Sequence, residues 1–505
     1  MNVKTLLKEH SAVCLAAGLS LIHWAVTFFT DHLIFEVSPS DNLFDYAVCK
    51  VLALIALYAF YYGIASLVFR KNKFLKEILF AALIYLPVMA VVCFIKLPQG
   101  YLSNDETLIV SSALHLEHYT WFYYLTTYFY IVSFMLIPAY LGPIFIKLLI
   151  EFLVVGYTVC RIKGTFGRPW GYFGYLLFLL YPVIAYTTSA HRLPVYFLLY
   201  LFLFTTLLFD GIEKKAPSRL KTVCLLLLGA LLTQWRTEGI YLLLLVPVLM
   251  LFVYPTLRKK KALITLILLS GLIQYLVSVP QNGIVAREMG AAADDRMKPF
   301  YAYTITNMFR NGLDPEKNAD DLAIVDKYLS LEKIDAINAY YGDINYEDVL
   351  ILYDNDFAGV REEATVTDFF NYANALKRIF KNNPGTFLRT RIGAFCYAAL
   401  PYKIETGSGL ISLGISAVKS LSYNLFIPLG IVLILCVYSL FRKRFYSFFA
   451  TAGILAHWLI VFILAPASYF KYYFPVYIMA YFYLLLLILQ LLYNRKHDEK
   501  VQILC

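Results

Sequence analysis

Long blocks of apolar residues recur along the whole chain and are separated by short polar segments. A helix needs about 20 apolar residues to cross roughly 30 Å of hydrocarbon, and these blocks have about that length. They lack the period-two alternation of half-buried strands, and only helices or closed barrels satisfy the backbone in lipid. We therefore expect an all-α polytopic membrane protein with about twelve transmembrane helices. The expected spans lie near residues 11–30, 46–69, 75–96, 139–160, 170–188, 193–210, 221–235, 238–256, 262–280, 423–440, 446–465 and 473–493.

Composition supports this class and excludes a soluble protein. Hydrophobic residues make up 60% of the 505-residue chain and charged residues only 15%, whereas soluble domains carry about 25% charged residues. The eight cysteines form no C-x-x-C pair, so neither a disulfide framework nor a zinc site is indicated. The N-terminal block lacks a small-residue cleavage site, so we interpret it as a retained first span.

The formal net charge of +10 comes from short basic segments between the apolar blocks. Such segments mark the cytoplasmic side of a membrane protein and contact anionic lipid head groups, so nucleic acid is not an expected partner. Their alternation with acidic segments places both termini in the cytoplasm and residues 31–45, 97–120 and 281–391 outside. The basic segments are 70–76, 161–168, 214–221, 258–261, 442–444 and 495–500.

Residues 121–137 are apolar enough to form a further span. Counting them would place the basic segment 161–168 outside and invert every later basic segment. We therefore interpret 107–137 as outer-side helices in or near the membrane interface, where Trp and Tyr are favoured. A re-entrant pair of helices is the alternative.

The polar composition of residues 281–391 predicts a folded domain, because the stretch holds 18 of the 34 acidic residues. Its pattern predicts helices, for example 319–334 and 366–380, the second ending at Asn382-Asn383-Pro384. The expected organisation is two N-terminal transmembrane helices in 1–74, a transmembrane core in 75–280 with an outer acidic loop at 97–138, an extracytoplasmic domain in 281–391, an outer interfacial segment in 392–421, and C-terminal transmembrane helices with a short cytoplasmic tail in 422–505.

Two adjacent acids, Asp105 and Glu106, follow the third expected span at the outer face. A carboxylate there can take a proton from an incoming hydroxyl group that lies within hydrogen-bond reach. The alternative is purely structural: Ser103 or Asn104 caps a helix and the acids occupy its first turn. The spacing of Asp105 with His115 and His118 also leaves a metal site as an alternative.

Several cations are expected on the same face. His191 and Arg192 lie between the fifth and sixth spans, and Arg236 lies between the seventh and eighth. Charges this close to hydrocarbon usually face a polar cavity or a partner, and arginine suits phosphate oxygens. The structural alternatives are an Arg236–Glu238 ion pair or snorkelling to the interface. Lys471 lies among tyrosines near the last span, where lysine is also a common interface anchor.

Absent patterns narrow the function. The chain has no G-x-x-x-x-G-K-[ST] phosphate loop, which argues against an ATP-driven pump. Few ionisable residues lie near the middle of a span, Lys147 and Glu151 being two of them, whereas coupled transporters usually carry such charges. A transporter or flippase remains an alternative.

These motifs together resemble the GT-C class of integral membrane glycosyltransferases, particularly bacterial relatives of protein mannosyltransferases and aminoarabinose transferases. The resemblance rests on Asp105-Glu106 before the interfacial helices, on Arg236 to Gly239 opening a later span, and on the aromatic run Tyr469 to Pro475 with its lysine. It covers most of residues 75–493 through short motifs.

The resemblance implies a bacterial plasma-membrane enzyme that moves a sugar from a polyprenyl-phosphate donor to a glycan, lipid or protein acceptor outside the membrane. Asp105 would be the base that activates the acceptor, with Glu106 as the alternative. Basic residues would hold the donor phosphate. No cofactor is implied with certainty, and a divalent metal remains open. The candidate phosphate ligands are His191, Arg192, Arg236 and Lys471.

Two features depart from this family. Its acidic loop normally follows the first span, so the earlier loop 31–45, with Asp31, Asp41 and Asp45, is a rival location. The soluble domain precedes the last three spans, which suits bacterial polysaccharide polymerases and ligases, the second candidate class. Their outer loops are typically rich in arginine, and this chain offers Arg287, Arg296, Arg310, Arg361, Arg389 and Arg391.

Overall fold

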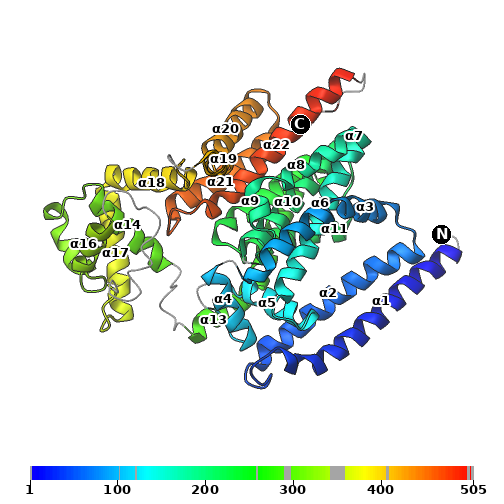
Figure 1. Ribbon diagram of the computed structural model, residues 1–505, viewed down its shortest axis with the longest axis horizontal. Coiled ribbons are helices and arrows are strands. Elements are labelled where there is room, and N and C mark those ends of the chain that lie inside the picture. Colours follow the sequence, from blue (N-terminus) through cyan, green and yellow to red (C-terminus); the bar gives the residue numbers. More distant parts are fainter. Residues whose placement is uncertain are drawn as a thin grey trace. The chain divides into compact units, whose positions relative to one another are not determined.

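The computed structural model describes residues 3–101, 103–119, 122–190, 192–257, 260–288, 297–341, 359–404, 409–496 and 501. Every regular element in these ranges is a helix (Figure 1), and strand-like pairing is limited there to one isolated bridge between Leu329 and Val360. The expected all-α fold class is therefore confirmed.

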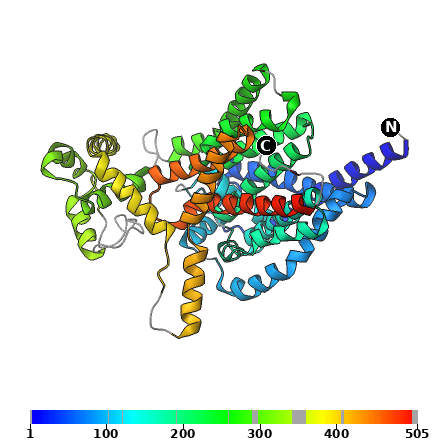
Figure 2. The ribbon, with the colours of Figure 1, turned by 90° about the horizontal axis from the view of Figure 1, so that it is seen from above.

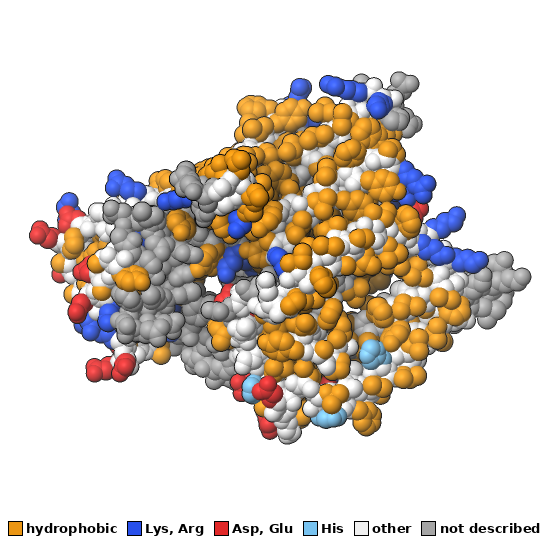
Figure 3. Space-filling view, in the orientation of Figure 1, with side chains coloured by type: hydrophobic (Ala, Val, Ile, Leu, Met, Phe, Trp, Pro, Cys, Tyr) orange, Lys and Arg blue, Asp and Glu red, His pale blue; other side chains and the backbone are white. Residues whose placement is uncertain are grey.

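Nine helices within the described ranges are long and apolar enough to cross a membrane. Apolar side chains on them are widely exposed, for example Phe29 at 76% and Phe94 at 84%, and such side chains cover much of the visible surface (Figure 3). Exposure on this scale is stable in lipid and not in water. The nine helices are Ser11–Leu33, Leu43–Phe69, Lys73–Gln99, Gly142–Phe166, Leu193–Ile212, Lys261–Gly283, Leu410–Phe441, Phe445–Leu464 and Phe470–Lys496.

The chain forms two compact units. The first comprises Met1–Gln281, Cys436–Ala450 and Ile478–Cys505, and the second comprises Asn282–Leu435 and Thr451–Tyr477. In the first unit, α1 (Val3–Thr30) and α2 (Leu43–Phe69) lie side by side. The other helices of this unit include α3 (Lys73–Lys96), α4 (Asn104–Leu114), α5 (Tyr124–Leu136), α6 (Gly142–Phe166), α10 (Arg192–Ile212), α11 (Arg219–Thr233), α12 (Leu242–Val253) and most of α13 (Lys260–Glu288).

The segment expected as a span at 170–188 is divided into short helices instead of one continuous helix. They are α7 (Arg168–Gly171), a 3₁₀ turn, α8 (Tyr175–Phe178) and α9 (Tyr181–Ala185). Pro182 lies in the first turn of α9 and cannot continue a preceding helix. Hydrogen bonds to α3 hold the segment, since the Tyr175 hydroxyl donates to the carbonyl of Ala81 at 2.6 Å.

The helices α4 and α5, in the region expected to lie at the outer interface, have 11 and 13 residues and are too short to span. Most side chains of α5 are buried, including Tyr128, Tyr130 and Phe134. Helix α5 packs against α2, α4 and α6. It is therefore covered by protein over most of its surface.

In the second unit, a core of buried apolar side chains joins α14 (Lys298–Arg310), α15 (Ala319–Val325), α16 (Leu331–Tyr341), α17 (Val366–Asn382) and α18 (Pro384–Ala399). The single helix expected over 319–334 is two helices, because the carboxylate of Asp326 accepts the backbone N–H of Leu331 and Leu329 pairs with Val360. The helix expected over 366–380 is present as α17 and ends before Asn383.

Helix α17 begins with a capping box. The Thr365 hydroxyl accepts the backbone N–H of Asp368 at 3.2 Å, and the Asp368 carboxylate accepts the backbone N–H of Thr365 at 2.9 Å. Hydrogen bonds from Thr365 lower the pKa of the Asp368 carboxyl group. Since they favour the ionised form, this cap stabilises the helix at neutral pH.

The capping box predicts a pH-dependent stability of α17. A carboxyl group with a lowered pKa in the folded state contributes stability above its unfolded pKa of about 3.9, and loses it as the pH falls through the folded pKa. Replacing Asp368 by Asn should therefore lower amide protection in the first turn of α17 at pH 7, and this difference should shrink towards pH 3. Hydrogen exchange of the full chain, corrected for intrinsic rates, measures it. The exposed Glu363→Gln is the control, and an equal loss in both variants would contradict the prediction.

Candidate active site

The acidic pair lies in the first turn of α4. The Ser103 hydroxyl accepts the backbone N–H of Glu106 at 3.3 Å, so Ser103 caps the helix. The two carboxylates stand at the positive end of the helix dipole, where negative charge is favoured. The helix cap proposed as the structural alternative for this motif is therefore confirmed. Whether either acid can also act as a base depends on the groups around its carboxylate.

These surroundings differ for the two acids. Glu106 is fully buried, and its Oε1 accepts hydrogen bonds from the Ser189 hydroxyl at 2.9 Å, the backbone N–H of Ala190 at 2.8 Å and the Tyr130 hydroxyl at 3.3 Å. Asp105 is half-buried. The Glu106 carboxylate therefore joins the start of α4 to a segment 84 positions later in the chain.

That segment, residues 185–190 from the last residue of α9 to the chain before α10, has carbonyl groups that accept hydrogen bonds from two lysines. Lys96 donates to the carbonyl of Ala185 at 2.8 Å. Lys147 donates to the carbonyls of Tyr186, at 3.0 Å, and Thr187, and lies 2.5 Å from Glu151. Both Lys147 and Glu151 are buried, and removing their charges from water costs free energy. Their ion pair and the hydrogen bonds to the carbonyls offset this cost.

Helix α10 begins at Arg192, directly after this segment. Of the two expected phosphate ligands here, His191 lies outside the described residues, and the Arg192 side chain does too. The backbone that precedes them has fixed partners, because Glu106 accepts from the backbone N–H of Ala190 and Lys96 and Lys147 donate to carbonyls of residues 185–187.

Arg236 is buried in the connection between α11 and α12. Its Nη2 donates to Oε1 of Glu238 at 2.6 Å, and its Nε donates to Oε2 at 3.3 Å. The ion pair proposed as the structural alternative for Arg236 is therefore present. The guanidinium also lies 5.9 Å from the ring centroid of Tyr196, on the second turn of α10.

The same connection contacts α5. The rings of Trp235 and Phe129 meet edge to face with centroids 5.5 Å apart. Phe129 precedes Tyr130, which donates to Glu106, so α5 is next to both the acidic turn and the arginine-bearing segment. Three segments far apart in sequence, 103–106, 185–190 and 235–239, thus gather in the first unit.

Lys471 belongs to the second unit, in a 3₁₀ turn before α22 (Phe474–Lys496). Its Nζ lies 4.8 Å from the ring centroid of Tyr469 and 5.9 Å from that of Tyr472. This environment among tyrosines is the one described for an interface anchor.

Arg391 on α18 forms hydrogen bonds with the end of the helix that precedes the Lys471 segment. This buried arginine donates to the carbonyls of Phe462 and Ala465, at 2.6 and 2.9 Å, at the end of α21 (Phe445–Leu464). A cation at the C-terminal end of a helix interacts favourably with the helix dipole. The hydroxyl of Tyr303, on α14, pairs with that of Ser468 in the same connection.

The rival acidic loop 31–45 is also engaged in buried contacts. Asp31 forms an ion pair with Lys50 at 2.7 Å and accepts the Tyr46 hydroxyl at 2.6 Å. Asp45 accepts the Tyr128 hydroxyl at 2.6 Å, whereas Asp41 is exposed. The two buried acids in this loop join α1, α2 and α5.

The histidines of the suggested metal spacing pair with different acids. Nε2 of His115 lies 3.2 Å from Glu36, and Nε2 of His118 lies 3.2 Å from Asp45. In the part of the chain that the structure describes, no three His, Cys, Asp or Glu side chains form a group that could hold a metal ion.

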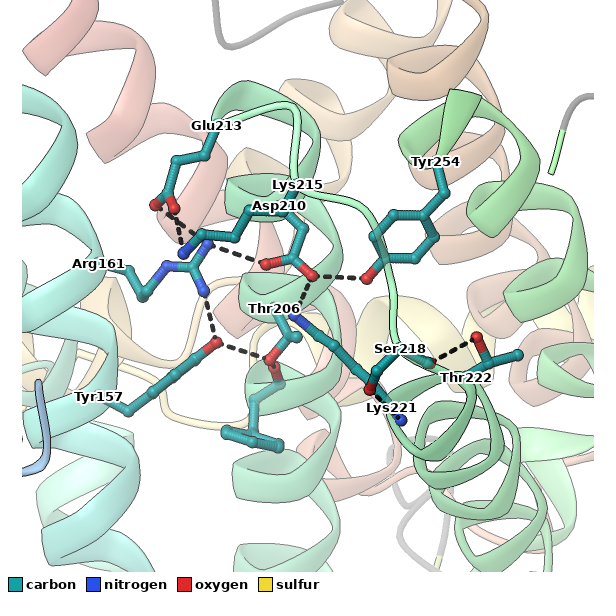
Figure 4. A network of polar contacts seen from close by, with 11 residues as sticks. Tyr157, Arg161, Thr206, Asp210, Glu213, Lys215, Ser218, Lys221, Thr222 and Tyr254 are labelled. Carbon is teal, nitrogen blue, oxygen red and sulfur yellow. Dashed lines mark hydrogen bonds and ion pairs between the residues drawn. The ribbon is translucent and has the colours of Figure 1, made fainter. Parts of the chain in front are cut away.

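A buried polar network that the sequence did not reveal ties helix ends together (Figure 4). The fully buried Asp210 on α10 lies 3.2 Å from Nη2 of Arg161 on α6 and accepts the Tyr254 hydroxyl at 2.5 Å. Lys221 on α11 also pairs with it. The basic clusters at 161–168 and 214–221 were interpreted only as topology signals, and charge counting does not show which members are paired.

Comparisons with known proteins give no relative for this chain: no family model matches it, and neither does a curated protein or a solved structure.

The connection at Arg236 predicts a strict requirement for glycine at position 239. A Cβ on Gly239 would lie 2.9 Å from the carbonyl oxygen of Leu232 and 3.2 Å from the Tyr196 hydroxyl. Gly239→Ala should therefore destabilise the protein by about 1–3 kcal/mol, as overpacking does. Thermal unfolding in detergent measures the loss. Gly271→Ala is the matched control, because a Cβ there meets nothing within 4 Å, and equal stability of the two variants would refute the requirement.

The Asp210 network predicts a large loss of stability when its central acid is removed. Asp210→Ala leaves the buried Arg161 without this partner, and breaking a buried pair costs about 3–5 kcal/mol. The control is Glu213→Gln, because Glu213 contacts Arg161 at 3.1 Å from a side chain that is 30% exposed. Chemical unfolding of both variants in the same detergent tests this, and a smaller loss for Asp210→Ala than for Glu213→Gln would contradict it.

Proposed function

We propose that this protein is a membrane glycosyltransferase that moves a sugar from a polyprenyl-phosphate donor to an acceptor at the outer face of the membrane. The main support is the gathering of the acidic turn 103–106, the segment 185–190 that leads to Arg192, and the Arg236 connection in one unit. A carboxylate and arginines on segments that gather in one unit suit an acceptor hydroxyl and a donor phosphate.

In this proposal Asp105 is the catalytic base. It accepts the proton of the acceptor hydroxyl, whose oxygen attacks the anomeric carbon as the bond to the phosphate oxygen breaks. Polyprenyl phosphate leaves with the electron pair. Glu106 is the less suitable base, because its Oε1 already accepts three hydrogen bonds and its side chain is fully buried. Glu106 is instead a positioning residue.

The donor phosphate would be bound by cations on the same face. Arg236 is oriented by Glu238 and by the ring of Tyr196. The start of α10 is held by Glu106 and Lys147 through the preceding segment, which would place His191 and Arg192. Lys471 is proposed as a further phosphate ligand on the grounds of sequence alone.

The proposed topology has twelve spans, with both termini in the cytoplasm of a bacterium and the protein in its plasma membrane. Nine long helices support most of this count. The remaining three spans would be the short helices of 168–185, α11 and the helical stretch Thr237–Val253. The acceptor would be a cell-envelope glycan, lipid or protein.

Contacts of two arginines in the expected extracytoplasmic domain, 281–391, favour this proposal over a polymerase or ligase. Arg391 is buried against helix-end carbonyls, and Arg361 pairs with Asp326 at 2.9 Å. Lys147, which pairs with Glu151, likewise donates to backbone carbonyls, which supports a structural role for the pair more than one in transport.

Glycosyl transfer by the purified protein in lipid, with radiolabelled polyprenyl-phosphate sugars, tests the proposal. Asp105→Asn should lower the rate by about 100-fold or more, because a general base contributes about 10²–10⁴-fold. Glu106→Gln should lose less, because an amide oxygen can still accept from Ser189 and Ala190. Asp41→Asn, in the rival loop, is the exposed control, and each reaction is run with and without a chelator.

Turnover that is indifferent to Asp105→Asn in a folded variant would overturn the assignment of the base and move the site to 31–45 or to the ectodomain. Absence of turnover with every donor would overturn the glycosyltransferase proposal and favour a transporter or flippase.

A further inference from the structure

A cavity of about 830 Å³ lies in the second unit between α19 (Leu410–Ser422) and the chain that follows α18. Its lining combines cations, hydroxyls and aliphatic side chains. The residues that matter here are Tyr402, Lys403, Ile411, Ser416 and Lys419. Its lining includes none of the residues assigned a catalytic or donor-binding role above.

Helix α19 is amphipathic. Ser412, Ser416 and Lys419 follow one another at spacings of four and three residues, so they share one face of the helix and line the cavity. Apolar residues of the same helix are strongly exposed, with Leu410 at 89% and Ile411 at 81% just before Ser412, and Ile415 at 55% and Val418 at 54% between the polar positions. Figure 2 shows α19, in amber, extending away from the other helices of its unit.

The combined length of α19 and the helix that follows it indicates that α19 lies at a membrane boundary. Helices α19 and α20 (Phe426–Phe441) together cover the 32 residues Leu410–Phe441. At 1.5 Å per residue they would extend about 48 Å, well beyond the roughly 30 Å of hydrocarbon. The chain breaks between them, where the Asn424 side chain accepts the backbone N–H of Ile427 at 3.0 Å. The 16 residues of α20 extend about 24 Å, so α20 can cover most of the hydrocarbon thickness while α19 lies in the interface.

Local contacts set the two lysines at the cavity. The Ser416 hydroxyl donates to the carbonyl of Lys403 at 3.0 Å, which fixes the chain after α18 against α19. Nζ of Lys419 lies 5.8 Å from the ring centroid of Tyr402. Tyr402 in turn meets Tyr423 edge to face, with centroids 5.0 Å apart. Two cations thus line a hollow beside an aliphatic surface.

We propose that this cavity binds the phosphate head group of an anionic glycerophospholipid of the bilayer. Lys403 and Lys419 supply the positive charge, Ser412 supplies a hydroxyl group, and the acyl chains cover the exposed apolar residues of α19. Lysines at a membrane surface attract anionic lipids, and an amphipathic helix buries its apolar face at the head-group boundary. This inference is independent of the glycosyltransferase proposal.

Native mass spectrometry of the full chain in detergent tests the site, with phosphatidylglycerol and phosphatidylcholine as probes. We expect selective retention of phosphatidylglycerol. Each lysine contributes about fivefold, so Lys403→Gln/Lys419→Gln should weaken retention about 25-fold. Lys403→Arg/Lys419→Arg should retain it. The matched control is Lys377→Gln/Lys381→Gln, which removes two exposed lysines from α17.

Equal retention of the two lipids, or unchanged retention by the folded Gln variant, would overturn the proposal. Displacement of phosphatidylglycerol by inorganic phosphate would mean a site for the free anion. Displacement by an equimolar polyprenyl phosphate would assign the cavity to the donor lipid. Circular dichroism and thermal unfolding establish that each variant is folded.

Discussion

The segment between α9 and α10 depends on buried charges, and the arrangement of the candidate site depends on that segment. Residue 185 ends α9 and residues 186–190 form no regular helix, so the backbone groups of this segment need partners from elsewhere. Lys96 and Lys147 donate to their carbonyls, and Glu106 accepts from their N–H side. The backbone in turn stabilises charges that would be costly to bury alone. Together these bonds hold the acidic turn of α4 and the start of α10 in one place.

The same physical solution recurs at other helix ends. Asp210 is surrounded by donors from α6, α11 and the end of α12, and Arg391 donates to the terminal carbonyls of α21. In each case a charge next to apolar surface has several partners, as such charges need. These residues hold elements in position, so charge close to hydrocarbon is not by itself a sign of a substrate site.

Some features of the candidate site followed from local pattern. The cap at Ser103 and the pairing of Arg236 with Glu238 involve residues two or three positions apart, and both were recognised as structural alternatives. The role of Lys147 could not be recognised, because its partners are backbone carbonyls, which every residue has. The distinction between Asp105 and Glu106 was also out of reach, since it depends on donors from α5 and the segment before α10.

The sequence by itself determined the all-α class, the positions of nine helices long and apolar enough to cross a membrane, and helix α17, because apolar block length and helix-ending residues act over a few turns. Only the tertiary structure decided that 168–185 is broken into short helices bound to α3, and that 319–334 is divided. It also decided which buried charges meet. Those outcomes depend on contacts between segments tens of residues apart, and the local pattern of apolar and polar positions predicts burial without naming the partner.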